Sequence, residues 1–176
     1  MKKYVFIVIS FAICSCRDGN NRIEEEIRML HGSTIDFVQG YEPVTNDNTS
    51  EFAKILRRKH KVVSYVDYYS CTSCMIRNFN NNADEIHEQL GNSIPYVLVI
   101  YTPNIDMTKR QLEEHNINAY IILYNTKKFE EENNLDVLAC NKTFLINSEN
   151  KVLVVGEPFG DKKRWSVYKK ALASFK

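Results

Sequence analysis

The chain has 176 residues, of which 44% are hydrophobic and 26% charged, and its formal net charge is +1. These are the values of an ordinary globular protein, long enough to bury one sizeable core. A nearly neutral chain argues against partners that are nucleic acids or strongly acidic, and we expect no nucleic-acid binding.

The first segment has the pattern of an export signal. Two lysines precede an apolar run from Tyr4 to Ile13, which is too short to span a bilayer. The run ends in Ile13-Cys14-Ser15-Cys16, which resembles a bacterial lipobox, where a small residue precedes a lipidated cysteine. We predict a lipoprotein signal peptide over residues 1–15 and a lipid on Cys16; the alternatives are a plain signal peptide or an uncleaved anchor. The lipid anchor implies attachment to a membrane of the bacterial cell envelope, facing the periplasm or at the surface.

Residues 16–48 are predicted to be a tether and N-terminal extension, and residues 49–176 a single domain. In the extension we expect a short helix at 23–30, a small strand at 33–38 and turns at 40–48. Predicted helices of the domain span residues 49–60, 70–90, 107–115, 127–133 and 162–175. Its predicted strands span residues 62–68, 94–101, 119–123, 143–146 and 152–155, the last two joined by a hairpin turn. This order is typical of an α/β sandwich whose central sheet is partly parallel.

Apolar residues at helical spacing predict the inward faces of the two longest helices. In the helix at 70–90 they are Met75, Phe79, Ile86 and Leu90. In the helix at 162–175 they are Trp165, Tyr168 and Leu172.

The five cysteines divide by position. Cys14 leaves with the signal peptide and Cys16 carries the lipid, so Cys71, Cys74 and Cys140 remain. An exported protein lives where disulfides persist. A pair and one leftover cysteine do not make a structural disulfide framework, which indicates one functional pair.

The pair lies in the run Cys71-Thr72-Ser73-Cys74, directly after the predicted strand at 62–68 and at the start of a predicted helix. Unpaired N–H groups and the partial positive charge of a helix N-terminus stabilise a thiolate, which is the reactive form of cysteine. Two cysteines three positions apart can also form a disulfide across one turn. The pattern therefore predicts a redox dithiol.

The order of elements resembles the thioredoxin fold: a strand, a Cys-x-x-Cys motif opening a long helix, a βαβ unit, and a final hairpin and helix. The segment Lys142-Thr143-Phe144-Leu145-Ile146-Asn147-Ser148-Glu149-Asn150-Lys151-Val152 resembles the "Thr-Phe-Leu-Ile-Asp-x-x-Gly-Lys-Val" strand pair of membrane-anchored redoxins of the TlpA and ResA type. The strand and helix over residues 119–133 match the insertion of those redoxins. The resemblance covers residues 52–175 and implies a thioredoxin-like three-layer α/β sandwich with a mixed central sheet.

The resemblance also implies roles for the cysteines. Cys71 would attack a target disulfide and Cys74 would resolve the mixed disulfide. The implied partners are protein thiols or disulfides and a redox partner protein, and no cofactor or metal is expected.

Three positions depart from the pattern of the family. Lys142 stands where these proteins carry a cis-proline, and the bond before it is expected to be trans, because a cis bond before a non-proline residue costs about 3–4 kcal/mol. Ser70 replaces the tryptophan before the first cysteine, and Tyr65 replaces a buried acid. The nearest acid is Asp67, which shares a strand face with Tyr65 by alternation.

Three residues near the motif have alternative interpretations. Lys142 either lowers the pKa of the Cys71 thiol or points into solvent. Asp67 either accepts a proton from Cys74 or caps the turn after its strand. Cys140 is either a third thiol, for disulfide relay or a soft metal, or an ordinary buried cysteine.

Two functions remain. The first is an envelope thiol-disulfide oxidoreductase that uses Cys71 and Cys74; the second is a non-catalytic binding or scaffold lipoprotein in which the pair is structural or vestigial. Retention of both cysteines favours the first, and the substitutions Lys142 and Ser70 favour the second. Other chemistries lack a pattern, since the chain has no haem-attachment motif, no second cysteine pair for zinc and only scattered histidines.

Overall fold

The computed structural model describes residues 24–25, 27–44, 49–67, 72–115, 117–136 and 142–174. The described residues form one mixed sheet whose strands lie in the order β1-β4-β3-β2-β5-β6. The strands are β1 (Glu42–Pro43), β2 (His60–Asp67), β3 (Tyr96–Tyr101), β4 (Tyr120–Tyr124), β5 (Thr143–Asn147) and β6 (Val152–Val155). The helices are α2 (Thr49–Leu56), α3 (Thr72–Leu90), α4 (Ile105–Glu113), α5 (Lys128–Glu132) and α6 (Lys162–Ser174).

The sheet is parallel at its centre and antiparallel at its edges. β3 pairs in parallel with β2 and with β4. β5 runs antiparallel to β2 and to β6, and β1 runs antiparallel to β4. The sheet is therefore partly parallel, as predicted, because α3 and α4 are the crossovers that return the chain to the same end of the sheet.

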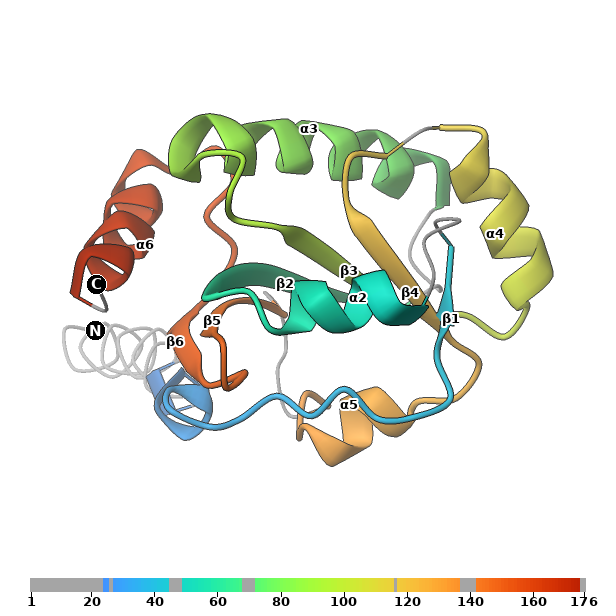
Figure 1. Ribbon diagram of the computed structural model, residues 1–176, viewed down its shortest axis with the longest axis horizontal. Helices are drawn as coiled ribbons and strands as arrows, with labels where there is room; N and C mark the ends of the chain where they lie inside the picture. Colours follow the sequence, from blue (N-terminus) through green and yellow to red (C-terminus); the bar gives the residue numbers. More distant parts are fainter. Residues whose placement is uncertain are drawn as a thin grey trace, which may run out of the picture.

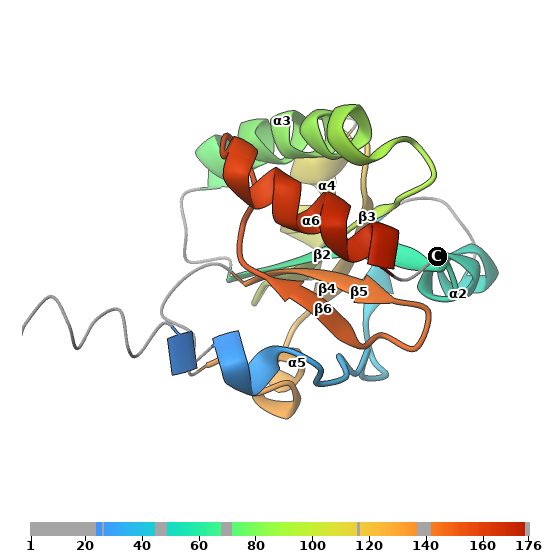
Figure 2. The same ribbon diagram turned by 90° about the vertical axis from the view of Figure 1, so that its left-hand side faces the viewer.

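Helices cover both faces of the sheet (Figure 1, Figure 2). The first core cluster joins the sheet to α3, α4 and α6, and the second joins it to α2, α5 and the N-terminal residues. Alternation along β2 supplies both clusters: Val62 belongs to the first, and Val63 and Tyr65 to the second. This arrangement confirms the predicted three-layer α/β sandwich.

The long helix α3 is held to the sheet by one apolar stripe. Phe79, Ala83 and Ile86 follow at helical spacing and are buried, together with Trp165 and Tyr168 of α6. Burial of such side chains stabilises the fold by about 1.5–3 kcal/mol for each large one. The predicted inward positions Leu90 and Leu172 are partly buried, and the side chain of Met75 lies outside the described residues.

The N-terminal segment, residues 32–44, begins against the edge strand β6. The Gly32 N–H donates to the Val152 carbonyl at 2.9 Å, and the Val152 N–H donates to the Ser33 carbonyl at 2.8 Å. The only strand-like pairing described at 33–38 is a single bridge between Thr34 and Lys151, so the predicted strand at 33–38 is wrong. Within the described part of the chain, the backbone of this segment pairs only with residues 150–152, at the turn and the first residue of β6, and forms one bridged residue pair there.

The same segment ends against the opposite edge strand, β4. Glu42 pairs with Leu123 and Pro43 with Ile122, so the predicted turn at 40–48 contains the short strand β1. A proline at an exposed edge needs no partner for its missing N–H, which is why this strand has turn-like composition. Figure 1 shows the segment crossing the molecule from β6 to β1 on the side of α5.

Two predicted boundaries move by several residues. The helix predicted at 49–60 ends at Leu56, and β2 begins at His60, two residues before the predicted strand. His60 pairs with Asn147 and Lys61 with Ile146, so pairing with β5 fixes the start of β2. None of the described helices is long and apolar enough to cross a bilayer.

Candidate functional site

The predicted dithiol belongs to the junction between β2 and α3. Helix α3 begins at Thr72, directly after Cys71 in the sequence, and Cys74 is its third residue. The first turn contains no acidic residue, so the positive end of the helix dipole is not neutralised by a carboxylate of its own. Cys71, Cys140 and Cys16 lie outside the described residues, as does the side chain of Cys74.

Lys142 lies beside the end of β2. The Tyr65 N–H donates to its carbonyl at 2.8 Å, which aligns Lys142 with β2 just before β5. The Lys142 ammonium forms an ion pair with Glu130 of α5 and lies 5.2 Å from the ring centroid of Tyr65. Its side chain is only 19% exposed, so the lysine is held inward rather than directed into solvent. The peptide bond before it involves Asn141, which lies outside the described residues.

Glu130 is the residue that sequence reasoning missed. It is 6% exposed, although the neighbouring Glu131 and Glu132 are exposed. Besides Lys142, its carboxylate accepts a hydrogen bond from the Tyr65 hydroxyl at 3.4 Å and lies 3.7 Å from the Lys127 ammonium. A buried carboxylate is stable only with such partners. The signal in the sequence was the neighbouring Phe129, the single apolar residue among charged ones.

Tyr65 connects this pair to the core. Its ring stacks on Phe129, with centroids 5.7 Å apart and an angle of 23° between the planes. Burial and the nearby Glu130 carboxylate raise the pKa of the Tyr65 hydroxyl well above its ordinary value. Tyr65 is therefore a neutral donor to Glu130 at any physiological pH, and it cannot supply the negative charge of the buried acid that the resemblance to thioredoxin implies at this position.

Asp67 is the last residue of β2 and contacts the same group of charges. The Lys127 ammonium donates to its Oδ2 at 3.0 Å and also lies 5.5 Å from the ring centroid of Tyr101. This hydrogen bond raises the pKa of Lys127, which keeps the exposed ammonium charged. Asp67 thus joins Lys127, Glu130 and Lys142 in a chain of alternating charges, which we call the ion network. Its predicted roles toward Cys74 and the following turn concern residues outside the described part and stay predictions.

The ion network contains two carboxylates and two ammonium groups, so its formal charge is zero. It lies at the end of β2 from which the chain continues to the cysteine motif. Such a network can raise or lower the pKa of a nearby thiol. Its ammonium groups lower that pKa, its carboxylates raise it, and each charge partly cancels the effect of its neighbour. Across the described residues no group of three His, Cys, Asp or Glu side chains is arranged to hold a metal ion.

Other polar groups lie at the opposite end of the sheet. A cavity of about 300 Å³ is lined there by Arg58, His87 and Asn118, among others. The Asn118 amide lies 3.2 Å from Nδ1 of His87. His60, at the start of β2, is buried. Its pKa is lowered mainly by this burial and further by the positive charges of Lys59 and Lys61. These groups are separated from the ion network by the length of β2, about 20 Å or more at 3.3 Å per residue.

Comparison with known proteins relates the chain to others through structure. The sequence matches no family model and no curated protein. Among solved structures, the thioredoxin domain of a thiol-disulfide oxidoreductase from Bacteroides vulgatus superposes with a TM-score of 0.53 at 17% identity, covering 80% of this chain and 97% of that one. The N-terminal domain of PilB from Neisseria gonorrhoeae superposes with a TM-score of 0.53 at 12% identity, covering 77% of this chain and 93% of that one.

At these identities the likeness concerns the fold. The mixed sheet, the helices on both faces and the placement of α3 after β2 agree with it. The chain therefore has a thioredoxin-like α/β fold, which confirms the predicted fold class.

Proposed function

We propose that the protein is a thiol-disulfide oxidoreductase of the bacterial cell envelope that uses Cys71 and Cys74 on protein thiols or disulfides. The observation that carries the proposal is the start of α3. In a thioredoxin-like fold, this helix begins between the two cysteines with no carboxylate in its first turn. A helix N-terminus of that kind favours the thiolate of an adjacent cysteine.

The reaction follows from thiol-disulfide exchange. The Cys71 thiolate attacks one sulfur of a target disulfide, forms a mixed disulfide and releases the other target sulfur as a thiolate, which takes up a proton. Cys74 then loses its proton and attacks Cys71, which releases the second target thiol. The target disulfide is reduced by two electrons and the Cys71–Cys74 pair is oxidised to a disulfide. A dithiol protein partner reduces the pair again, and the same steps reversed oxidise a substrate.

We propose a positioning role for two residues of the ion network. An ammonium group at Lys142 favours the Cys71 thiolate, and the Glu130 carboxylate paired with it opposes that effect. Because the two charges partly cancel, we propose that the difference between their effects on the Cys71 thiolate sets the reactivity of Cys71.

Trapping of intermediates tests the proposal. Wild type and Cys71→Ser, Cys74→Ser and Cys140→Ser variants are compared in the reduction of a model protein disulfide. Cys71→Ser and Cys74→Ser should abolish turnover, and only Cys74→Ser should accumulate a mixed disulfide with the target. Cys140→Ser is the matched control if that cysteine is buried; loss of turnover in it would indicate the relay role.

One specific observation favours the second function, a non-catalytic binding or scaffold protein. Lys142, at the position of the family's cis-proline, is engaged by Glu130 and Tyr65. A reduction potential of the Cys71–Cys74 pair below about −300 mV, with no trapped target, would indicate a structural disulfide and refute the enzymatic proposal.

We further propose that Cys16 carries a lipid that holds the domain to a membrane. The lipobox-like run before Cys16 supports this. Growth with a labelled fatty acid should label the wild-type protein and leave a Cys16→Ala variant unlabelled. Equal labelling of both would contradict the anchor.

A further inference from the structure

The C-terminal helix α6 concentrates positive charge. It has five cationic residues and no carboxylate, whereas the whole chain has a net charge of only +1. Lys162 and Lys163 are followed seven residues later by Lys169 and Lys170, which places the two pairs about two turns apart on one helix face. All four are exposed.

These four lysines, here called the lysine face, lie on the side of α6 turned away from the core. Trp165 and Tyr168 form its buried side. By helical spacing Ser166 lies at the centre of this face and Val167, which is 50% exposed, at its edge. The face is therefore cationic with one exposed apolar residue beside it.

Few of these charges are compensated. Within the described part of the chain, Lys162, Lys163 and Lys170 have no carboxylate within ion-pair distance, and the Lys169 ammonium donates to the neutral Gln89 side chain at 2.8 Å. Only the fifth cation, Arg164, has an acidic partner, Asp161 at 3.5 Å. A cluster of unpaired positive charges on an otherwise neutral protein attracts an anionic partner.

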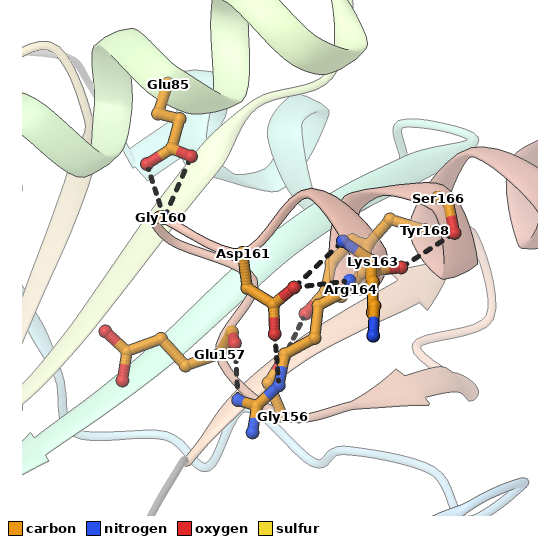
Figure 3. Close-up of polar contacts among 9 residues, drawn as sticks. All are labelled: Glu85, Gly156, Glu157, Gly160, Asp161, Lys163, Arg164, Ser166 and Tyr168. Atoms are coloured by element: carbon orange, nitrogen blue, oxygen red, sulfur yellow. Dashed lines mark hydrogen bonds and ion pairs between the residues drawn. The ribbon is translucent and has the colours of Figure 1, made fainter.

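The helix is mounted rigidly (Figure 3). The Glu85 carboxylate of α3 accepts the Gly160 N–H at 3.0 and 3.1 Å. The same carboxylate accepts the Trp165 indole N–H at 2.6 Å. Asp161 Oδ1 accepts the N–H of Lys163 at 2.8 Å, which caps the helix. The Tyr168 hydroxyl donates to the Gly156 carbonyl at 2.8 Å. The lysine face is thus a fixed surface of the domain.

The lysine face lies at the end of the molecule where the N-terminal part joins the sheet. α6 follows β6, and Gly32 is hydrogen-bonded to β6. Figure 1 shows α6, β6 and the first coloured residues at the left-hand end of the molecule, and Figure 2 shows α6 above the sheet and those residues below it. Cys16 precedes Glu24 by eight residues, a span of at most about 29 Å. A lipid on Cys16 would therefore lie at the same end of the molecule as α6.

We propose that the lysine face binds the anionic phospholipid headgroups of the membrane that holds the protein. A lipid chain combined with a polybasic patch is a known pair of membrane signals, and the patch adds a preferred orientation to the anchor. α6 contacts α3 through Glu85, thirteen residues after Thr72, or about 20 Å along the helix. Binding through α6 therefore directs the start of α3 away from the lipid surface. The inference rests on the lipid anchor proposed at Cys16 and does not depend on the redox proposal.

Partition between two kinds of vesicle tests the inference. The full chain is mixed with phosphatidylcholine vesicles and with vesicles containing equal parts of phosphatidylcholine and phosphatidylglycerol, and the ratio of the two partition constants is measured. This ratio cancels the contribution of the apolar N-terminal run. Lys163→Gln/Lys170→Gln should lower the ratio by about 25-fold, at about 5-fold for each lysine.

The matched control is Lys54→Gln/Arg57→Gln. It removes the same charge from exposed residues in and directly after α2, which covers the other face of the sheet. The control should change the ratio by less than about 2-fold, and roughly 0.5 M salt should remove the preference of the wild type. Equal losses in both variants would overturn the inference in favour of a general charge effect. An unchanged ratio in the α6 variant would also overturn it, and would indicate that the lysine face serves an anionic protein.

Discussion

Replacing Lys61 by methionine is expected to stabilise the protein at neutral pH. Lys61 lies within β2, and its side chain is completely buried. Its ammonium donates to the Asn147 carbonyl at 2.7 Å, and no carboxylate of the described residues pairs with it. Burial of the uncompensated charge lowers the pKa of Lys61 from 10.5 to about 8.

The sign and size of the effect follow from proton linkage. The unfolded chain keeps the Lys61 proton up to about pH 10.5, whereas the folded chain releases it near pH 8. The unfolded state therefore binds more protons in this window, and the free energy of unfolding rises as the pH increases from about 8 to 10.5. At about 1.36 kcal/mol per pH unit, the charged Lys61 destabilises the fold at pH 7 by about 3 kcal/mol. Methionine loses a hydrogen bond of about 1 kcal/mol, so the expected net gain is about 2 kcal/mol.

Urea unfolding, monitored by circular dichroism at several pH values between about 7 and 10, measures the net gain in stability and its dependence on pH. The wild type should gain stability over this range relative to Lys61→Met, and the two should converge near the upper limit. The exposed neighbour Lys59 provides the control, since Lys59→Met should leave the stability and its pH dependence nearly unchanged. Parallel pH dependences of wild type and Lys61→Met would refute the reasoning.

Three further predictions concern the ion network and the hydrogen bonds that hold α6 to α3. Glu130→Gln should destabilise the fold by about 1–3 kcal/mol in urea unfolding, because it leaves the Lys142 ammonium without its buried partner. Adding Lys142→Met should recover part of this loss, and strictly additive effects of the two substitutions would contradict the prediction. Lys142→Ala should raise the pKa of the Cys71 thiol and Glu130→Gln should lower it, as measured by thiolate absorbance; an unchanged midpoint in Lys142→Ala would exclude the role proposed for that lysine. Glu85→Ala should lower the free energy of unfolding by about 1–3 kcal/mol and change the fluorescence of Trp165, and an unaltered emission would contradict the hydrogen bond to the indole.

The features that the sequence predicted well are those with a strong period. The apolar stripe of Phe79 and Ile86 and the alternation along β2 give the positions of two elements and the faces they bury. These local patterns, taken in order, were enough for the thioredoxin-like fold. They also identified Lys142 as a residue of interest, because its position along the chain is defined by the strand that follows it.

The features that the sequence did not predict depend on contacts between distant segments. Glu130 resembles its exposed neighbours until α5 packs against Tyr65, 65 residues earlier in the chain. Lys61 lies just before the predicted strand at 62–68, yet pairing with β5 carries β2 back to His60. In both positions packing against a distant segment buries a charged residue that local composition would place at the surface.

The course of the N-terminal segment has a consequence for the solubility of the protein. One end of it covers β6 through Gly32 and Ser33, and the other end covers β4 through β1, so a single stretch of chain pairs with both outer edges of the sheet. Unpaired edge strands are templates for edge-to-edge association with other copies of a chain. A shortened protein that starts at residue 49 would uncover the edge of β4, which is almost entirely apolar, together with that of β6. Such a protein is expected to aggregate even where its core remains folded.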